Sequence, residues 1–213
     1  MFTAAITGTG VLTPQAVITN DELVVAFNAH ADLFNAENAD AIAAGTVDAK
    51  PQSSADFIFA ASGIEQRYVL DRDGILDPER MYPNLPARTD DAPSYMAEIG
   101  LDAAQKALTE AGLTGADIDL VICAASNMER AYPAVGVEIQ QLLGAGGFAF
   151  DMNVACSSAT FGIQTAVDMI RAGSIQRAIV INPEICSAHL EWRDRDCHFI
   201  FGDVATATIL ERD

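Results

Sequence analysis

One cysteine, Cys156, has the sequence surroundings of a catalytic nucleophile. It follows a short apolar segment at 148–152 that predicts a strand, and it precedes a segment at 157–172 with helical spacing. A tight strand-to-helix turn presents a side chain at a helix N-terminus, where partial positive charge favours a thiolate and free N–H groups can bind an oxyanion. The alternative is a small buried side chain at a helix start, and the residue chemistry alone leaves both open.

The elements around Cys156 alternate between apolar strands and helices. Continuous apolar strands that alternate with helices predict an α/β fold with a mainly parallel sheet covered on both faces. The glycines at 112, 144 and 173 are typical helix stops. The pattern predicts strands at 119–125, 148–152, 177–181 and 205–210, and helices at 94–111, 134–143 and 157–172.

The chain opens with a predicted strand and a predicted helix start, and residues 28–92 are less regular. Residues 4–12 predict a short strand followed by a glycine-rich turn at Gly8-Thr9-Gly10. A dinucleotide-binding fingerprint is excluded, because position 13 is Thr and Pro14 prevents the helix that should follow. Asn20 is expected to cap a helix. Residues 28–92 predict a long insertion of surface helices and loops rather than core strands.

Composition excludes several classes of function. Thirty acidic residues against twelve Lys and Arg give a net charge of −18, which disfavours nucleic acid and anionic membranes as partners. No apolar run approaches the ~20 residues of a membrane span, and the start lacks the basic region of a signal peptide. Four cysteines without paired spacing predict a reducing, cytoplasmic location.

Several motifs occur together in one order along the chain, and they resemble the family of β-ketoacyl-acyl-carrier-protein synthase III, within the thiolase-like superfamily. The segment Phe150–Cys156 looks like that family's nucleophile segment, and Phe201-Gly202-Asp203 looks like its later glycine turn. The other matching segments are Gly8–Gly10, Leu12–Pro14, Thr19–Leu23, Ser62–Tyr68, Ala131–Pro133 and Ile139–Gly144.

This resemblance implies a fold and a reaction. The fold is one half of a duplicated, layered α/β/α thiolase-like fold, with residues 1–213 as the N-terminal half and an insertion at about 28–92. The reaction is the decarboxylating condensation of an acyl-CoA primer with malonyl-acyl carrier protein, through an acyl group on Cys156, in fatty-acid biosynthesis. The insertion and the stretch 75–80 suggest a branch whose primer exceeds acetyl.

The resemblance also implies binding residues. Phe57 and Arg195 correspond to the two side chains that sandwich the adenine of coenzyme A, while Ala61 stands where the family has a phosphate-binding Arg. Tyr132 corresponds to the aromatic residue that crosses the dimer interface and closes the partner's acyl pocket. Coenzyme A enters as part of the substrate, with no separate cofactor and no metal site.

The resemblance places the family's catalytic His and Asn in a second half beyond residue 213, so a C-terminal half and a homodimer are expected partners. None of the three histidines here matches the catalytic position. His30 is expected to face solvent and His189 to lie on a polar loop. His198 is the one that could approach a site, although a packing role is the ordinary expectation.

Two other functions remain compatible with the sequence. A thiolase or a hydroxymethylglutaryl-CoA-synthase-type acyltransferase would keep the cysteine and use another acceptor. A non-catalytic assembly subunit would retain Cys156 without using it.

Overall fold

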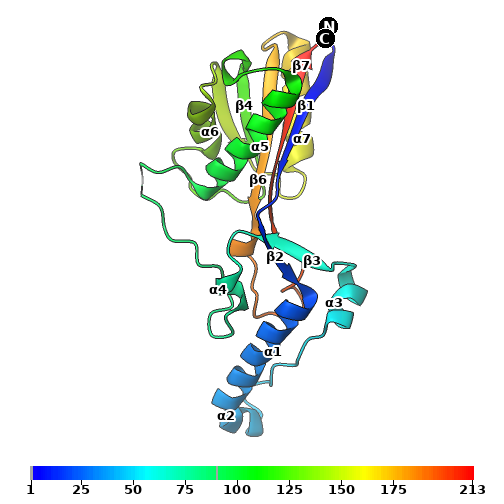
Figure 1. The fold of residues 1–213 in the computed structure, drawn as a ribbon, viewed down its shortest axis with the longest axis vertical. Coiled ribbons are helices and arrows are strands. Elements are labelled where there is room, and N and C mark those ends of the chain that lie inside the picture. The colour runs from blue at the N-terminus through cyan, green and yellow to red at the C-terminus, as the bar shows by residue number, and fades with distance from the viewer. Residues whose placement is uncertain (1, 90) are drawn as a thin grey trace. The chain divides into compact units, whose positions relative to one another are not determined.

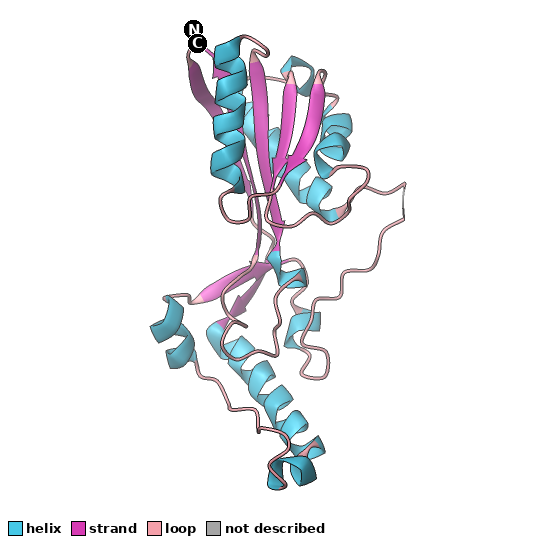
Figure 2. Ribbon diagram, turned by 180° about the vertical axis from the view of Figure 1, so that it is seen from behind, coloured by secondary structure: helices cyan, strands magenta, loops and turns pink. Residues whose placement is uncertain are grey.

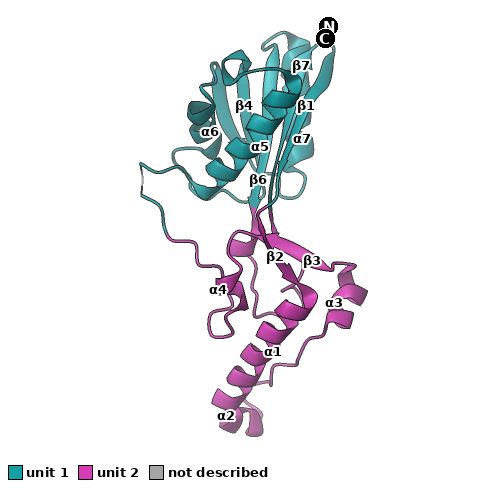
Figure 3. Cartoon of the chain, in the orientation of Figure 1, with its two compact units in different colours: residues 1–13, 87–184, 204–213 teal, residues 14–86, 185–203 magenta. Residues whose placement is uncertain are grey.

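The computed structural model describes residues 2–89 and 91–213, and these residues divide into two compact units (Figure 3). Unit 1 comprises residues 1–13, 87–184 and 204–213, and unit 2 comprises residues 14–86 and 185–203. Unit 2 overlaps the expected insertion at 28–92 but also draws in a segment from late in the chain. None of the helices within the described ranges is long and apolar enough to cross a membrane.

The strands and helices follow the chain in the order drawn in Figure 1. The strands are β1 (Ala4–Leu12), β2 (Ala16–Thr19), β3 (Gln66–Val69), β4 (Leu120–Ala124), β5 (Phe148–Met152), β6 (Arg177–Ile185) and β7 (Asp203–Arg212). The α-helices are α1 (Asn20–Glu37), α2 (Ala39–Ala43), α3 (Ala55–Ser62), α4 (Asp73–Leu76), α5 (Tyr95–Ala111), α6 (Val135–Leu143) and α7 (Ser158–Ala172). Short 3-10 turns lie at Gly115–Asp117 and Cys186–Ala188.

Unit 1 is built on a sheet of strand order β1-β7-β6-β4-β5. Strand β4 pairs in parallel with both β5 and β6, while β1 pairs antiparallel with β7. All five residues of β4 are buried, as a central strand covered on both faces requires. The predicted α/β class with a mainly parallel central sheet is therefore confirmed.

Helices cover both faces of this sheet, as the ribbon in Figure 2 shows. Leu120, Ile122 and Ala124 of β4 pack with Ala166 and Ile170 of α7, while α5 and α6 pack together on the other face. All three helices end at glycines in the left-handed conformation, at the predicted positions 112, 144 and 173.

The glycine pair Gly8 and Gly10 has a different role from the predicted turn. Both residues lie inside β1. A Cβ atom on Gly10 would sit 2.0 Å from the carbonyl oxygen of Ala103, and one on Gly8 would sit 2.3 Å from that of Ala107. The glycines therefore let helix α5 lie close against the strand, and the prediction of a turn was wrong because spacing alone does not reveal this contact.

Unit 2 has a core of its own, which corrects the expectation of surface helices and loops at 28–92. Strands β2 and β3 pair antiparallel beside α1, and the buried cluster draws residues from both segments of the unit. Its members include Ile18, Leu23, Phe27, Ile58, Met81 and Trp192. The apolar positions are spread over short elements, so no single stretch carries a clear periodic signal.

Helix α1 begins with a capping box. The Thr19 hydroxyl accepts the N–H of Glu22, and the Glu22 carboxylate accepts the N–H of Thr19, which lowers the Glu22 pKa to about 2. Thr19 is thus the cap in place of the predicted Asn20. Asn20 is buried in the first turn, where it bonds the Ile64 carbonyl and the Arg67 guanidinium.

Candidate functional site

Cys156 lies in unit 1, in the turn between β5 and α7, and is exposed to solvent. It directly precedes Ser157, the residue at the N-cap of α7. Ala155 has a φ of +48°, in the left-handed region that non-glycine residues rarely occupy. A strained backbone before an exposed cysteine at a helix N-terminus is the geometry of a nucleophile elbow.

Short polar side chains hold the Cys156 turn in this conformation. The Asn153 Oδ1 accepts the N–H of Ala155 at 3.1 Å. The Ser158 hydroxyl oxygen accepts the N–H of Val154 at 2.9 Å and lies 2.7 Å from the carbonyl of Ala155 and 3.1 Å from that of Ala125. Ser158 therefore ties the cysteine turn to the residue after β4.

A second set of bonds links the same turn to β6. The Glu184 carboxylate near the end of β6 accepts the N–H and the hydroxyl of Ser126, both at 2.6 Å. The carbonyl of Ser126 in turn accepts the Asn153 amide at 2.9 Å. The carboxyl ends of three strands are thus joined beneath Cys156, and sequence analysis missed this network because its members are up to 58 residues apart.

Tyr132 is 90% exposed and lies in a loop of unit 1 that is anchored on both sides. On its C-terminal side, the Asp151 carboxylate of β5 accepts the N–H groups of Val135 at 2.9 Å and Gly136 at 2.7 Å, and so caps α6. Burial raises the pKa of Asp151. The cap comes from the strand that leads to Cys156, so the two predicted site residues share one support.

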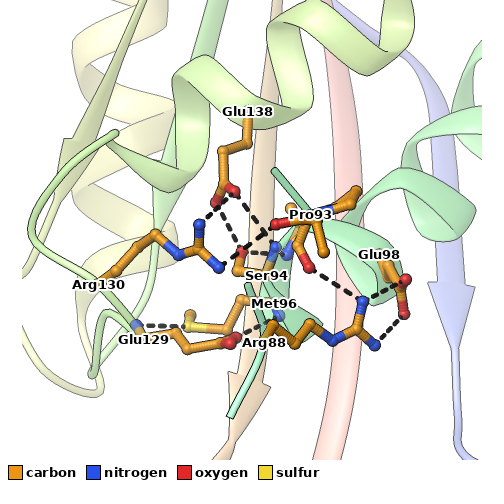
Figure 4. Close-up of polar contacts among 10 residues, drawn as sticks. Arg88, Pro93, Ser94, Met96, Glu98, Glu129, Arg130 and Glu138 are labelled. Atoms are coloured by element: carbon orange, nitrogen blue, oxygen red, sulfur yellow. Dashed lines mark hydrogen bonds and ion pairs between the residues drawn. The ribbon is translucent and has the colours of Figure 1, made fainter. Parts of the chain in front are cut away.

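On the N-terminal side of Tyr132, the neighbouring residues bind the start of α5 (Figure 4). The Glu129 carboxylate accepts the N–H of Met96 at 3.0 Å. Glu138 of α6 is nearly buried and accepts the Ser94 hydroxyl at 2.7 Å, with the Arg130 guanidinium 3.4 Å away. The loop that carries Tyr132 is therefore anchored on both sides by hydrogen bonds, while its tip faces solvent.

Phe57 and Arg195 both lie in unit 2 and stack directly on each other. The guanidinium carbon of Arg195 is 3.7 Å from the centre of the Phe57 ring, and the Arg195 Nε donates to the Gln52 carbonyl at 2.8 Å. This separation equals one stacking distance, so the pair encloses no third ring. An adenine ring would have to separate them or stack on the other face of the guanidinium.

The three histidines lie in unit 2 and differ in burial. His198 is fully buried and stacks on Phe27 with 4.5 Å between ring centres, and burial lowers its pKa to about 4. This is the packing role that sequence analysis expected. His30 is half-buried, and its Nδ1 contacts the Pro78 carbonyl at 2.9 Å, so the expected solvent-facing position was wrong. His189 follows a 3-10 turn and is exposed.

The remaining cysteines and the glycine turn have packing roles. Burial raises the pKa of the Cys123 thiol well above its usual range, and Cys186 and Cys197 are half-buried. Asp203 is buried and accepts the N–H and the hydroxyl of Ser187 and the N–H of Leu70, so it joins segments of unit 2 that are far apart in the sequence. A Cβ on Gly202 would lie 2.5 Å from the Tyr68 carbonyl, so close approach requires this glycine. Within residues 2–89 and 91–213, no group of three or more His, Cys, Asp and Glu could hold a metal ion.

The chain is similar in sequence to proteins named as acyl-carrier-protein synthases. The family model of 3-oxoacyl-[acyl-carrier-protein (ACP)] synthase III matches residues 150–213. A β-ketodecanoyl-[acyl-carrier-protein] synthase of Pseudomonas aeruginosa is 53% identical over 87% of this chain and 53% of its own length. A β-ketoacyl-[acyl-carrier-protein] synthase III of Rhizobium johnstonii is 34% identical over 99% of this chain and 52% of its own.

The fold agrees with this similarity. The crystal structure of 3-oxoacyl-[acyl-carrier-protein] synthase III from Aquifex aeolicus superposes with a TM-score of 0.73 at 26% identity, covering 99% of this chain and 54% of that one. The chain thus spans about half the length of the relatives it matches. It is a thiolase-like segment of the β-ketoacyl-[acyl-carrier-protein] synthase III type, resembling one half of such a protein.

Proposed function

We propose that this chain supplies the nucleophile of a decarboxylating condensation in fatty-acid biosynthesis. Cys156 carries the reaction, and the observation that supports it most is its exposed place in a strained turn before α7. The Cys156 sulfur attacks the thioester carbonyl of an acyl-CoA, and the bond from that carbonyl to the coenzyme A sulfur breaks. The acyl group is then held on Cys156 and free coenzyme A departs.

The second step joins this acyl group to malonyl-acyl carrier protein. Loss of carbon dioxide leaves an electron pair on the malonyl α-carbon, which attacks the acyl-Cys carbonyl and expels the Cys156 thiolate. The helix N-terminus beside Cys156 favours the negative charge that returns to sulfur. Coenzyme A is substrate here and no separate cofactor takes part, and we place the reaction in the cytoplasm.

The primer we propose is a medium-length acyl chain. The Pseudomonas aeruginosa relative is named for a ketodecanoyl product, and a ten-carbon product corresponds to an eight-carbon primer lengthened by two carbons from malonyl. Octanoyl-CoA should therefore acylate Cys156 at least as well as acetyl-CoA. A competition measured as kcat/KM tests this, and a strong preference for acetyl would refute it.

The experiment on Cys156 is an intact-mass measurement with octanoyl-CoA. The natural chain should gain one octanoyl group, and Cys156→Ala should gain none while its folding is unchanged, since its side chain is exposed. Condensation with malonyl-acyl carrier protein should fall by about a thousandfold or more in that variant. Cys197→Ala is the control, because it removes a half-buried thiol in unit 2. Full condensation by Cys156→Ala would contradict the proposal, and acyl transfer without condensation would favour a different acceptor.

We also propose that the chain acts with the other half that its relatives carry, and that two copies associate around Tyr132. The chain spans about half of those relatives, and Phe161 of α7 is about half exposed, which supports a second half. The 90% exposure of Tyr132 supports the association of two copies there. The resemblance assigns the His and Asn donors for the thioester oxygen to that second half. Light scattering with a parallel condensation assay is the test. A monomer of these 213 residues that condenses both substrates would overturn it.

A further inference from the structure

Glu184, near the end of β6, begins a series of hydrogen bonds that ends next to Cys156. Its carboxylate accepts the N–H and the hydroxyl of Ser126, both at 2.6 Å. The Ser126 carbonyl accepts the Asn153 amide at 2.9 Å, and the Asn153 Oδ1 accepts the Ala155 N–H at 3.1 Å. This series, the Glu184 relay, connects a half-buried carboxylate to the residue that directly precedes the nucleophile.

Ala155 is the point in the cysteine turn that needs this support. Its φ of +48° is unfavourable for an alanine, so neighbouring bonds must hold the turn in this conformation. The bond from Asn153 does so only while its own side chain is fixed, and the Ser126 carbonyl fixes that side chain by accepting from the same amide group. Ser126, which follows β4, is fixed in turn by Glu184 of β6.

The relay passes through the backbone of Ser126. Its N–H donates to Glu184 and its carbonyl accepts from Asn153. The Ser126 hydroxyl adds a second bond to Glu184 and accepts the Asn127 amide at 3.2 Å, but neither bond leads to the cysteine turn. The side chains of Glu184 and Asn153 should therefore matter for Cys156, and the Ser126 hydroxyl should matter much less.

We propose that Glu184 is a positioning residue for Cys156 and acts on it through the relay. The inference rests on the proposed function, because it takes Cys156 as the nucleophile that receives the acyl group. Glu184 holds the Cys156 sulfur where it can attack the thioester carbonyl, and the carboxylate itself takes no part in bond making. A displacement of about 1 Å at a reacting atom costs about a hundredfold in rate.

A purely electrostatic role for Glu184 would have the opposite sign. A carboxylate at the same edge of the sheet disfavours a thiolate, so its removal would make Cys156 more reactive. Loss of position makes Cys156 less reactive, because its sulfur leaves the helix N-terminus that favours negative charge. The direction of the change in Glu184→Ala therefore separates the two roles.

The test measures how fast octanoyl-CoA acylates Cys156 in the intact protein. Glu184→Ala should lower the maximal acylation rate by about a hundredfold and leave the half-saturating octanoyl-CoA concentration unchanged. Glu184→Gln keeps an oxygen for the Ser126 N–H and should recover most of the loss. Asn153→Ser keeps an acceptor for the Ala155 N–H but lacks the amide donor, so it should match Glu184→Ala. Ser126→Ala should stay close to the natural rate.

Two further variants guard against a loss of folding. Asn153 is exposed, so Asn153→Ser tests the relay even where Glu184→Ala loses stability. Asn182→Ala is the matched control, because the Asn182 amide also joins β6 to β4, through the Ala124 carbonyl at 2.7 Å. Among the described residues Asn182 shares no hydrogen bond with Ser126 or Asn153, so its acylation rate should be unchanged. An unchanged or faster rate in Glu184→Ala, or an equal loss in Asn182→Ala, would overturn the inference.

Alkylation by iodoacetamide tests the relay without an acyl group. The Cys156 sulfur displaces iodide, and the rate follows the fraction of thiolate. Glu184→Ala should slow alkylation of Cys156, read by peptide mass, by about two- to fivefold, as the sulfur leaves the helix end. Asn182→Ala should not slow it, and equal rates in Glu184→Ala and the natural protein would contradict the inference. If the proposed function fails, the natural protein takes up no octanoyl group, yet this difference in alkylation remains.

Discussion

The two units differ in how completely their buried polar side chains are hydrogen-bonded, although Asn20 and Asp203 of unit 2 each bond two partners or more. In unit 1, Glu138, Asp151 and Ser158 each bond two or more partners at the ends of strands and helices. In unit 2, several buried side-chain atoms have no hydrogen-bond partner among the described residues. These atoms are His30 Nε2, Ser53 Oγ, Arg67 Nε and His198 Nε2.

This difference matches the part that unit 1 is proposed to play. A nucleophile must be held in one geometry, so unit 1 fixes its turn with satisfied bonds. Each unsatisfied buried group in unit 2 costs about 1–3 kcal/mol, which lowers the free energy needed for local opening. Unit 2, which carries no part of the cysteine turn, is the unit that bears this cost.

The largest effect should come from breaking the buried ion pair of unit 1. Glu138→Ala leaves the Arg130 guanidinium and the Ser94 hydroxyl without their carboxylate. The site is shielded from water, since the Glu138 side chain is only 9% exposed and that of Arg130 only 17%. We expect the free energy of unfolding to fall by about 3–5 kcal/mol. Urea unfolding measures this loss.

Glu98→Ala is the matched control for that change. Glu98 also bonds an arginine, Arg88, but its side chain is 49% exposed. Water replaces the lost partner there, so the cost should be about 0–1 kcal/mol. Equal losses in the two variants would contradict the view that unit 1 depends on its buried polar network.

The next effect concerns the pH dependence of unit 2. Burial lowers the pKa of His198 from 6.5 to about 4, so the folded state keeps it neutral while the unfolded chain takes up a proton. The stability from this neutral form is present above pH 6.5 and is lost as pH falls from 6.5 towards 4. At about 1.4 kcal/mol per pKa unit the loss amounts to about 3 kcal/mol.

His198→Gln removes the titration and replaces the imidazole by a neutral polar side chain. Urea unfolding at pH 7 and pH 4.5 should show a smaller pH dependence in this variant than in the natural chain. Asp203, whose pKa is raised by burial, favours acid pH, so only the difference between the two proteins isolates His198. His189→Gln should leave the pH dependence in place. An unchanged dependence in His198→Gln would refute the assignment.

The sequence predicted unit 1 far better than unit 2. The strands near 120, 150 and 180 and the helices that end at Gly112, Gly144 and Gly173 follow from hydrophobic period and helix stops. The prediction of a turn at Gly8 and Gly10 was wrong, because these glycines are required by the close approach of the α5 backbone, which lies about a hundred residues away in the sequence. Unit 2 joins Ile18 to Trp192 in one core, and no local pattern reveals such a pairing.

The candidate site was predictable only in part, for the same reason. Cys156 was predicted from its local sequence, in which a strand is followed by small residues and then a helix. Tyr132, Phe57 and Arg195 were predicted from the family resemblance. The supports Glu184 and Asp151 act through bonds to distant residues, so their side-chain types alone give no signal. The closed contact between Phe57 and Arg195 depends on the fold of unit 2, which brings residues 57 and 195 together.

The smallest effect is also the most direct comparison of the units, because one substitution should act with opposite signs. Ser158→Ala in unit 1 removes the acceptor for the Val154 N–H and should destabilise by about 1–2 kcal/mol. Ser53→Ala in unit 2 removes a buried hydroxyl without a partner among the described residues and should stabilise by about 1 kcal/mol. Ser53 keeps its backbone bonds to Asn28 in this variant, so only the hydroxyl is tested.

Urea unfolding of both serine variants under one set of conditions gives the two signs. Both serines are buried and both variants lose one hydroxyl oxygen, so the difference between their unfolding free energies reports the hydrogen bonds and not the loss of a hydroxyl itself. A loss of stability in Ser53→Ala would mean that its hydroxyl is satisfied in solution, and unit 2 would then resemble unit 1. Condensation should fall in Ser158→Ala, because the Cys156 turn loses a support, and should be unchanged in Ser53→Ala. The condensation assay therefore separates the positioning of Cys156 from overall stability, because Ser53→Ala should gain stability without gaining activity.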